Sequence, residues 1–154
     1  MLAVFVYCGS PMKDFSEFLK WEMTTRDTID VKKIYIDMAE DILAGLMLSQ
    51  IVYWHLPGHD GKIKLRVRKN GYLWLVKTYK DWWDETRLTA RQARRALSIL
   101  KKKGIVISEV RRFNGSPCTH IRINKEQFMW HWSAVLSVMT SRAYGSDTED
   151  KIIT

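Results

Sequence analysis

The sequence predicts an α+β fold in which a small group of helices packs with two β-hairpins. Three observations predict it. Apolar residues recur at helical spacing in several segments, other segments have the composition of paired strands, and each strand pair is interrupted by Asn-Gly. Helical spacing places apolar side chains along one stripe, and Asn-Gly is the strongest short signal for a hairpin turn. The predicted order is helix, hairpin, helix, turn, helix, hairpin, with a further helix at the end.

Two helices are expected before the first hairpin. Asp14 to Met23 has the apolar spacing of a short amphipathic helix, which we expect to serve as a lid or dimerisation element. The first core helix is expected over Met38 to His55, with Asp37 and Glu40 arranged like a capping box and Pro57-Gly58 ending it. Its apolar residues recur around much of the circumference, so we expect it to be buried on more than one side.

The first hairpin is expected over residues 62–77, with its turn at Asn70-Gly71. Its first strand alternates apolar and basic residues. The apolar face carries Ile63, Leu65 and Val67, and the basic face carries Lys64, Arg66 and Arg68. The basic face is either a second phosphate-binding surface or an ordinary solvated face, and the sequence does not choose between them.

Two capping boxes predict the next pair of helices. Thr78 with Asp81 begins a short helix, and Thr89 with Gln92 begins a longer one, the reading helix, which runs to about Lys103. In each box a threonine hydroxyl and an acidic or amide side chain satisfy amide groups that the first helical turn leaves free.

The inner faces of these two helices are expected to form the core. Ala93 and Ala96 are small, which would let the preceding helix approach closely, and Leu100 continues the same face. Trp82 and Trp83 of the short helix point roughly 100° apart, so at most one can face a ligand and stack on bases. We expect at least one of them in the core.

The second hairpin is expected as strands 105–110 and 118–123 around a tip at Asn114 to Pro117. Asn124 and Gln127 should cap a last helix, Lys125 to about Ser141. Its apolar side is expected to carry Phe128, Trp132, Val135, Leu136 and Met139.

We therefore divide the chain into four parts. They are an N-terminal extension (1–30), a core domain (31–124), a C-terminal amphipathic helix (125–145) and an acidic, disordered tail (146–154). Translation could also begin at Met12, which would make residues 1–11 a dispensable leader.

Positive charge is concentrated in the middle of the chain. The net charge is +8, yet residues 61–112 hold 16 Lys and Arg against 4 Asp and Glu, an excess of 12, while residues 1–60 hold 5 against 9. Residues 113–154 are balanced at 4 against 4. A field concentrated in this way is expected where a protein meets the phosphates of a nucleic acid.

The composition excludes several other classes. Cys8 and Cys118 lack the paired spacing of a zinc or redox site, none of the four histidines forms a metal-binding pair, and no phosphate loop or nucleophile elbow occurs. We expect no enzyme, metal or cofactor. The apolar run Leu2 to Tyr7 is too short for a signal or membrane span, so we expect a cytoplasmic protein with no membrane partner.

Six segments, which together span about half the chain, resemble the winged helix-turn-helix domains of replication-initiator-like and regulatory proteins of phages and plasmids. They are Leu48–Trp54, Lys77–Trp82, Leu88–Leu97, Leu100–Val106, Phe113–Pro117 and His120–Arg122. The resemblance implies a core of that fold, with an additional N-terminal segment, an extra β-hairpin and a C-terminal helix. It also implies that the reading helix enters the major groove of duplex DNA.

The residues favour the same interpretation. Long donor side chains lie on the face of the reading helix opposite its buried stripe, and arginine and glutamine can pair bidentately with guanine and adenine. The residues expected to read bases are Arg91, Gln92, Arg94, Arg95 and Ser98. Those expected to contact the DNA backbone directly or through the wing are Lys77, Thr78, Tyr79, Lys80, Thr89, Lys101, Lys102, Arg111, Arg112 and Asn114.

The sequence thus predicts a transcriptional regulator or replication-initiator-like protein of a mobile element that binds double-stranded DNA sequence-specifically. Its C-terminal helix offers an apolar surface for a homodimer. The alternative is an adaptor or inhibitor that uses the same scaffold to bind a protein partner, such as a host nucleic-acid enzyme. The adaptor hypothesis would be favoured if Arg91 and Arg94 were buried against acidic residues.

Overall fold

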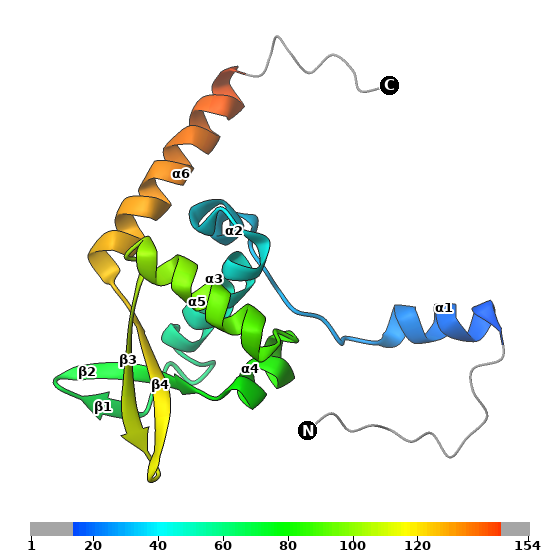
Figure 1. Cartoon of the computed structure of the whole chain (residues 1–154). Coiled ribbons are helices and arrows are strands. Elements are labelled where there is room, and N and C mark those ends of the chain that lie inside the picture. The colour runs from blue at the N-terminus through cyan, green and yellow to red at the C-terminus, as the bar shows by residue number, and fades with distance from the viewer. Residues whose placement is uncertain (1–13, 146–154) are drawn as a thin grey trace. The chain divides into compact units, whose positions relative to one another are not determined.

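The computed structural model describes residues 14–145, and its chain divides into two compact units, residues 1–30 and 31–154 (Figure 1). Each unit is described by itself. The acidic tail predicted at 146–154, Cys8 and the start at Met12 lie outside the described residues.

The described part of the first unit contains one helix, α1 (Phe15–Thr24). Its N-cap is Asp14, whose carboxylate accepts a hydrogen bond from the Glu17 amide at 3.0 Å. The rings of Phe15, Phe18 and Trp21 follow one another at 5.3 and 6.1 Å, and no residue of the helix is buried within its unit. The short helix predicted here is confirmed, while its role as a lid or dimerisation element stays a prediction.

The second unit begins with two helices where one was expected. They are α2 (Lys33–Ala39) and α3 (Ile42–His55), and Glu40 separates them in the left-handed conformation, with φ of 55°. The capping box predicted at Asp37 and Glu40 is wrong, because Asp37 lies inside α2. Asp41 caps α3 instead, accepting a hydrogen bond from the Ala44 amide at 2.9 Å.

The two hairpins form one four-stranded antiparallel sheet. Its strands are β1 (Val67–Lys69), β2 (Tyr72–Lys77), β3 (Val106–Phe113) and β4 (Ser116–Ile123), in the order β1-β2-β4-β3. Both hairpin turns are the two residues Asn-Gly, and all four turn residues have positive φ, as the favoured hairpin turn requires.

Both turns were placed correctly, but some strand boundaries differ. The first strand begins at Val67 and not at Lys62, and Ile63, expected on the apolar face of that strand, lies outside it and is 63% exposed. The tip of the second hairpin is shorter than predicted, so β3 runs on to Phe113 and β4 begins at Ser116.

The remaining helices are α4 (Tyr79–Thr86), α5 (Ala90–Lys102) and α6 (Lys125–Gly145). Both predicted capping boxes are present in full, at Thr78 with Asp81 and at Thr89 with Gln92. The Asn124 side chain accepts a hydrogen bond from the Gln127 amide at the start of α6, at 3.3 Å. The structure thus confirms an α+β fold with these three predicted helices.

The core of the second unit lies where α3, α4 and α5 pack on one another and against the sheet. Its most buried side chains, each at most 4% exposed, include Met47, Leu48, Ile51, Leu75, Trp82, Ala93, Ala96, Leu100, Ile105 and Ile121. Trp82 is in the core and its neighbour Trp83 is 37% exposed, as the spacing of the pair requires. Ala93 and Ala96 are buried where α5 meets its neighbours, as predicted.

The last helix, α6, runs away from the two hairpins (Figure 1). Phe128, Trp132 and Val135 pack against the core, and the Phe128 ring lies 6.4 Å from that of Tyr35 in α2. Other apolar side chains of α6 are exposed on several sides: Met129, Trp130, Leu136, Val138 and Met139. The helix is therefore not divided into the single apolar side and polar side that the sequence predicted.

Gly45 of α3 is the point of closest approach to α2. A Cβ at this position would lie 2.6 Å from the Ile36 Cα and 2.9 Å from the Ile36 nitrogen, which are backbone atoms that cannot turn aside. We expect Gly45→Ala to lower the free energy of unfolding by about 1–3 kcal/mol, since overpacking forces a backbone shift. Urea denaturation followed by circular dichroism measures this.

The matched control is Gly58→Ala. A Cβ there would lie 3.0 Å from the Asp60 carboxylate, the end of a flexible side chain, and at an ordinary contact distance of 3.7 Å from the Lys62 carbonyl. This variant should unfold at nearly the wild-type urea concentration. Equal stability of both variants and the wild type would contradict the close packing of α2 on α3.

Candidate nucleic-acid interface

The outer face of α5 carries exposed donor side chains. Arg91, Arg94 and Ser98 are exposed, while Ala93 and Leu100 on the opposite face are buried. The helix contains no Asp or Glu. Among the described residues, no ion pair joins Arg91 or Arg94 to an acidic side chain. Both guanidinium groups can therefore interact with a ligand.

Arg94 is positioned by the neighbouring helix. Its guanidinium lies over the ring of Tyr79, 5.4 Å from the ring centre, and Tyr79 is 47% exposed at the first residue of α4. A cation over an aromatic face is attracted by the negative charge of that face. The two side chains line a hollow of about 180 Å³ between α4, α5 and β4, together with Thr78 and Thr119.

Arg95 pairs with a carboxylate while its side chain stays 57% exposed. Its Nη2 and Nη1 atoms donate to the two carboxylate oxygens of Asp41 at 2.7 and 3.2 Å. Hydrogen bonding to Arg95, together with the Ala44 amide, holds the pKa of Asp41 below its usual value, and the same pair raises the pKa of Arg95. Arg95 was expected to read bases, and in the structure its guanidinium links α5 to the start of α3; its role in base reading stays a prediction.

Gln92 and the two capping threonines are also engaged. The Gln92 Oε1 accepts a hydrogen bond from the Thr89 amide at 3.0 Å, and the Thr89 hydroxyl accepts one from the Gln92 amide at 3.2 Å. The Thr78 hydroxyl accepts from the Asp81 amide at 3.1 Å. Gln92 would have to leave its cap to read a base, so the capping prediction is confirmed and the base-reading prediction is not supported by its position.

Lys77, expected to contact the DNA backbone, is enclosed. Its side chain is 9% exposed, its amine donates to the Glu85 Oε1 at 2.7 Å, and the same amine lies 3.8 Å from the centre of the Trp54 ring. The sequence could not reveal this, because Glu85 is eight residues away and Trp54 belongs to a different helix. Lys77 holds the end of β2 against α3 and α4.

Three other expected backbone contacts remain at the surface. Lys80 is exposed and donates to Asp84, one helical turn later, at 2.6 Å. This bond raises the pKa of Lys80 and lowers that of Asp84. Lys101 and Lys102 are exposed in the last turn of α5, so the cationic surface runs along the whole helix.

The turn of the second hairpin presents Arg112 and Asn114 to solvent. Arg111, predicted beside them, is half-buried. It forms an ion pair with Glu109, its Nε donating at 2.6 Å, and its guanidinium lies 5.9 Å from the Trp74 ring centre. Arg112 and Asn114 are therefore the available polar groups at this tip, while Arg111 stabilises the strand beneath it.

The first hairpin braces the second. The Lys69 amine donates to the Arg112 carbonyl at 2.6 Å, and the Lys69 carbonyl accepts from the Trp74 indole at 3.0 Å. Beneath this link His120 is fully buried, with its Nδ1 3.0 Å from the Cys118 carbonyl and its ring edge-on to that of Trp74. His120 is thus part of a buried cluster beneath the two hairpins.

Sequence reasoning missed this brace and the role of Asp41. Strand alternation does place Trp74 and His120 on the same face of the sheet, which could have suggested a second buried cluster. Nothing local distinguishes Lys69 from the neighbouring Arg68, or Asp41 from the nearby acidic residues. Their roles depend on partners 43 and 54 residues away.

The basic strand face predicted at Lys64, Arg66 and Arg68 is only partly solvated. The Lys64 amine donates to the Tyr53 carbonyl at 2.9 Å and lies 3.5 Å from the centre of the Tyr53 ring. Arg66 and Arg68 are exposed. Whether they bind phosphate stays open.

In residues 14–145 no cluster of three or more His, Cys, Asp or Glu side chains could hold a metal ion. His55 and His131 bond to backbone carbonyls, of Ile51 at 2.7 Å and of Lys103 at 3.0 Å. Burial lowers the pKa of His55. None of the described helices combines the length and apolar character needed to cross a membrane.

Comparison with known proteins adds nothing to this geometry: no family model, curated protein or solved structure matches the chain.

The Asp41 carboxylate serves both a helix cap and an ion pair, and two substitutions separate the roles. Asp41→Asn keeps a capping oxygen but loses the charge, whereas Asp41→Ala loses both and should cost about 1 kcal/mol more at neutral pH. Because the pKa of Asp41 is lowered by folding, its charge stabilises the protein above the usual pKa, and this stabilisation is lost as pH falls through the lowered value. Urea denaturation across that pH range should show that the free energy of unfolding falls less steeply with decreasing pH for Asp41→Asn than for the wild type.

The control is Asp60→Asn, since Asp60 caps no helix and is exposed in a loop. It should retain the wild-type pH dependence. If Asp41→Asn follows the wild-type curve at every pH, the ion pair with Arg95 contributes nothing to stability.

Removing the Lys77 amine should destabilise the protein without changing its ligand binding. Lys77→Met leaves the charge of Glu85, which is 24% exposed, without its partner, and such losses cost about 3 kcal/mol. The double variant Lys77→Met/Glu85→Gln should recover most of the lost free energy of unfolding, because no uncompensated charge remains. Thermal and urea denaturation of the wild type, Lys77→Met, Glu85→Gln and the double variant completes the cycle. Unchanged stability with weakened DNA binding would instead support the original expectation for Lys77.

Proposed function

We propose that this protein binds double-stranded DNA sequence-specifically, with α5 in the major groove. The observation that carries the proposal is the outer face of α5, where Arg91, Arg94 and Ser98 are exposed on a helix without acidic residues. Arginine can donate two parallel hydrogen bonds to the O6 and N7 atoms of guanine, and this is the commonest specific contact in the major groove.

The order of elements supports the same proposal. α3, the first hairpin, α4, α5 and the second hairpin follow one another as in a winged helix-turn-helix, with α4 and α5 as the paired helices and β3–β4 as the wing. A three-residue connection, Arg87 to Thr89, joins α4 to α5, and Arg87 has the left-handed conformation that ends α4.

In this proposal specificity and affinity come from different residues. Arg91 and Arg94 read bases, with Ser98 one turn further along, while Tyr79 holds Arg94 in place. Lys80, Lys101 and Lys102 provide phosphate attraction, which accounts for affinity in any sequence and weakens with salt. Free amide groups at the starts of α4 and α5 add to it, since helix N-termini attract phosphate.

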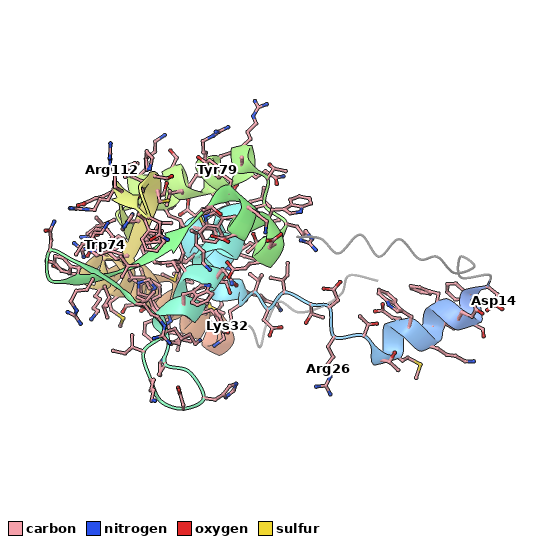
Figure 2. The ribbon with its side chains drawn as sticks, turned by 90° about the horizontal axis from the view of Figure 1, so that it is seen from below. Asp14, Arg26, Lys32, Trp74, Tyr79 and Arg112 are labelled. Atoms are coloured by element: carbon pink, nitrogen blue, oxygen red, sulfur yellow. The ribbon has the colours of Figure 1, made fainter. Side chains whose placement is uncertain are left out.

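The wing contributes Arg112 and Asn114 at its turn. A cationic hairpin beside a helix in the major groove is well placed to follow the backbone or enter the adjacent minor groove. Figure 2 shows Tyr79 and Arg112 on the same side of the second unit, which supports one continuous surface. The protein would act as a transcriptional regulator or a replication-initiator-like protein of a mobile element.

The protein-binding adaptor remains the second candidate. It would be favoured by Arg91 and Arg94 being buried against acidic side chains, and both are exposed. An adaptor could still use a cationic face to occupy the nucleic-acid path of an enzyme, so the two candidates are separated by direct binding.

The test is fluorescence anisotropy at two salt concentrations with a random-sequence duplex library, followed by the duplex that the wild type enriches. Arg91→Ala and Arg94→Ala should each remove about 1–3 kcal/mol of discrimination between the enriched duplex and a scrambled one. Nonspecific binding should fall much less, because the lysines remain.

The matched control is Lys32→Ala, which also removes one exposed cation. Lys32 lies on the side of the unit away from Tyr79 and Arg112 (Figure 2). This variant should keep the preference for the enriched duplex. Absence of salt-sensitive binding by the wild type would overturn the DNA proposal and favour the adaptor.

A further inference from the structure

The first hairpin and the residues beside it are strongly basic. Residues 61–80 hold seven Lys and Arg and no Asp or Glu. Only one of these seven cations, Lys80, belongs to the surface proposed above to bind DNA. A segment of one charge sign attracts polyanions, so the other six cations need an explanation of their own.

Four of the six cations have partners or an acidic neighbour within the fold. The Lys64 and Lys69 amines donate to backbone carbonyls at 2.9 and 2.6 Å, and the Lys77 amine is paired with a carboxylate at 2.7 Å. The Lys62 amide donates to the Asp60 carboxylate at 3.0 Å, which places an acidic charge beside Lys62. Structural roles or nearby charge therefore account for these four, and two arginines remain.

The remaining arginines, Arg66 and Arg68, present their guanidinium groups to solvent. Both residues are exposed, while Val67 and Lys69, which alternate with them, are half-buried. Successive side chains of a strand point to opposite faces, so the arginines share the outer face and Lys69 turns inward to the second hairpin. Within residues 14–145 no ion pair or side-chain hydrogen bond engages either arginine, and both can bind an anion.

The first hairpin extends the cationic surface past the wing. The turn of the first hairpin and the helices α4 and α5 lie on opposite sides of the second hairpin (Figure 1). The Lys69 amine, bonded to the Arg112 carbonyl, joins the two hairpins. Arg66 precedes Lys69 by three residues, about 10 Å along an extended strand, a distance that about three base pairs of duplex span. A duplex that runs from α5 across the wing therefore comes to the first hairpin within a few base pairs.

We propose that Arg66 and Arg68 bind phosphates of the duplex that flanks the site read by α5, on the side of the wing. The inference rests on the DNA-binding function proposed above and extends it, because the extra hairpin lengthens the bound segment. A guanidinium suits phosphate, to which it donates two parallel hydrogen bonds. Such contacts carry no sequence information, so they add affinity without changing which site is preferred.

The experiment is fluorescence anisotropy of the full chain with two duplexes. The short duplex holds only the enriched site, and the long one adds about one helical turn, roughly ten base pairs, at each end. The wild type should bind the long duplex more tightly. Arg66→Ala and Arg68→Ala should each weaken binding to the long duplex about 5-fold at ~0.1 M salt and reduce its salt slope by about 1. Binding to the short duplex and the preference for the enriched sequence should not change.

Two controls accompany these variants. Lys32→Ala removes one exposed cation on the side of the unit away from Arg112 (Figure 2) and should bind both duplexes as the wild type does. Arg68→Lys keeps the charge and should keep most of the salt slope.

Three outcomes would count against the proposal. Equal wild-type affinity for the two duplexes, or alanine variants that bind the long duplex as the wild type does, would overturn it and leave the DNA-binding function standing. Alanine variants that weaken binding to both duplexes equally would also overturn it, because the loss would not depend on the flanks. A wild type that binds neither duplex would refute the DNA-binding function itself.

Discussion

The arrangement of the helices depends on one carboxylate, that of Asp41. It ends the turn after α2, caps α3 through the Ala44 amide and accepts two hydrogen bonds from Arg95 on α5. These three elements carry much of the core, so one side chain links the start of α3 to α5. The buried face of α5, Ala93, Ala96 and Leu100, turns Arg91 and Arg94 outward, and the Asp41 carboxylate adds a contact at the edge of that packing.

Local patterns in the sequence predicted those parts of the fold that local physics determines. The boxes at Thr78 and Thr89 and the two Asn-Gly turns involve neighbours within three residues, and all four are present. The break between α2 and α3 was missed because several acidic residues stand in a row and each could cap a helix. Asp41 differs from Asp37 through its position after the left-handed residue Glu40 and its pairing with Arg95, and neither feature is visible in the local pattern.

In the candidate site, too, local features were predicted and contacts with distant residues were not. Helical periodicity correctly separated the outer face of α5 from its buried face. It could not identify which cations already have partners, because Asp41 and Glu85 come from other parts of the chain. Counting basic residues therefore overestimates a nucleic-acid surface, and the residues that remain available are fewer and lie closer together.

The hydrogen bond from the Lys69 amine to the Arg112 carbonyl ties the first hairpin to the second and limits how far the second can move. A free hairpin of eight-residue strands would sweep through many orientations, and ordering it on a ligand would cost conformational entropy. Here the first hairpin restricts the second through this hydrogen bond, which lowers the entropy that ordering β3 and β4 would cost. A substitution in the first hairpin could therefore change the position of Arg112 without altering β3 or β4 themselves.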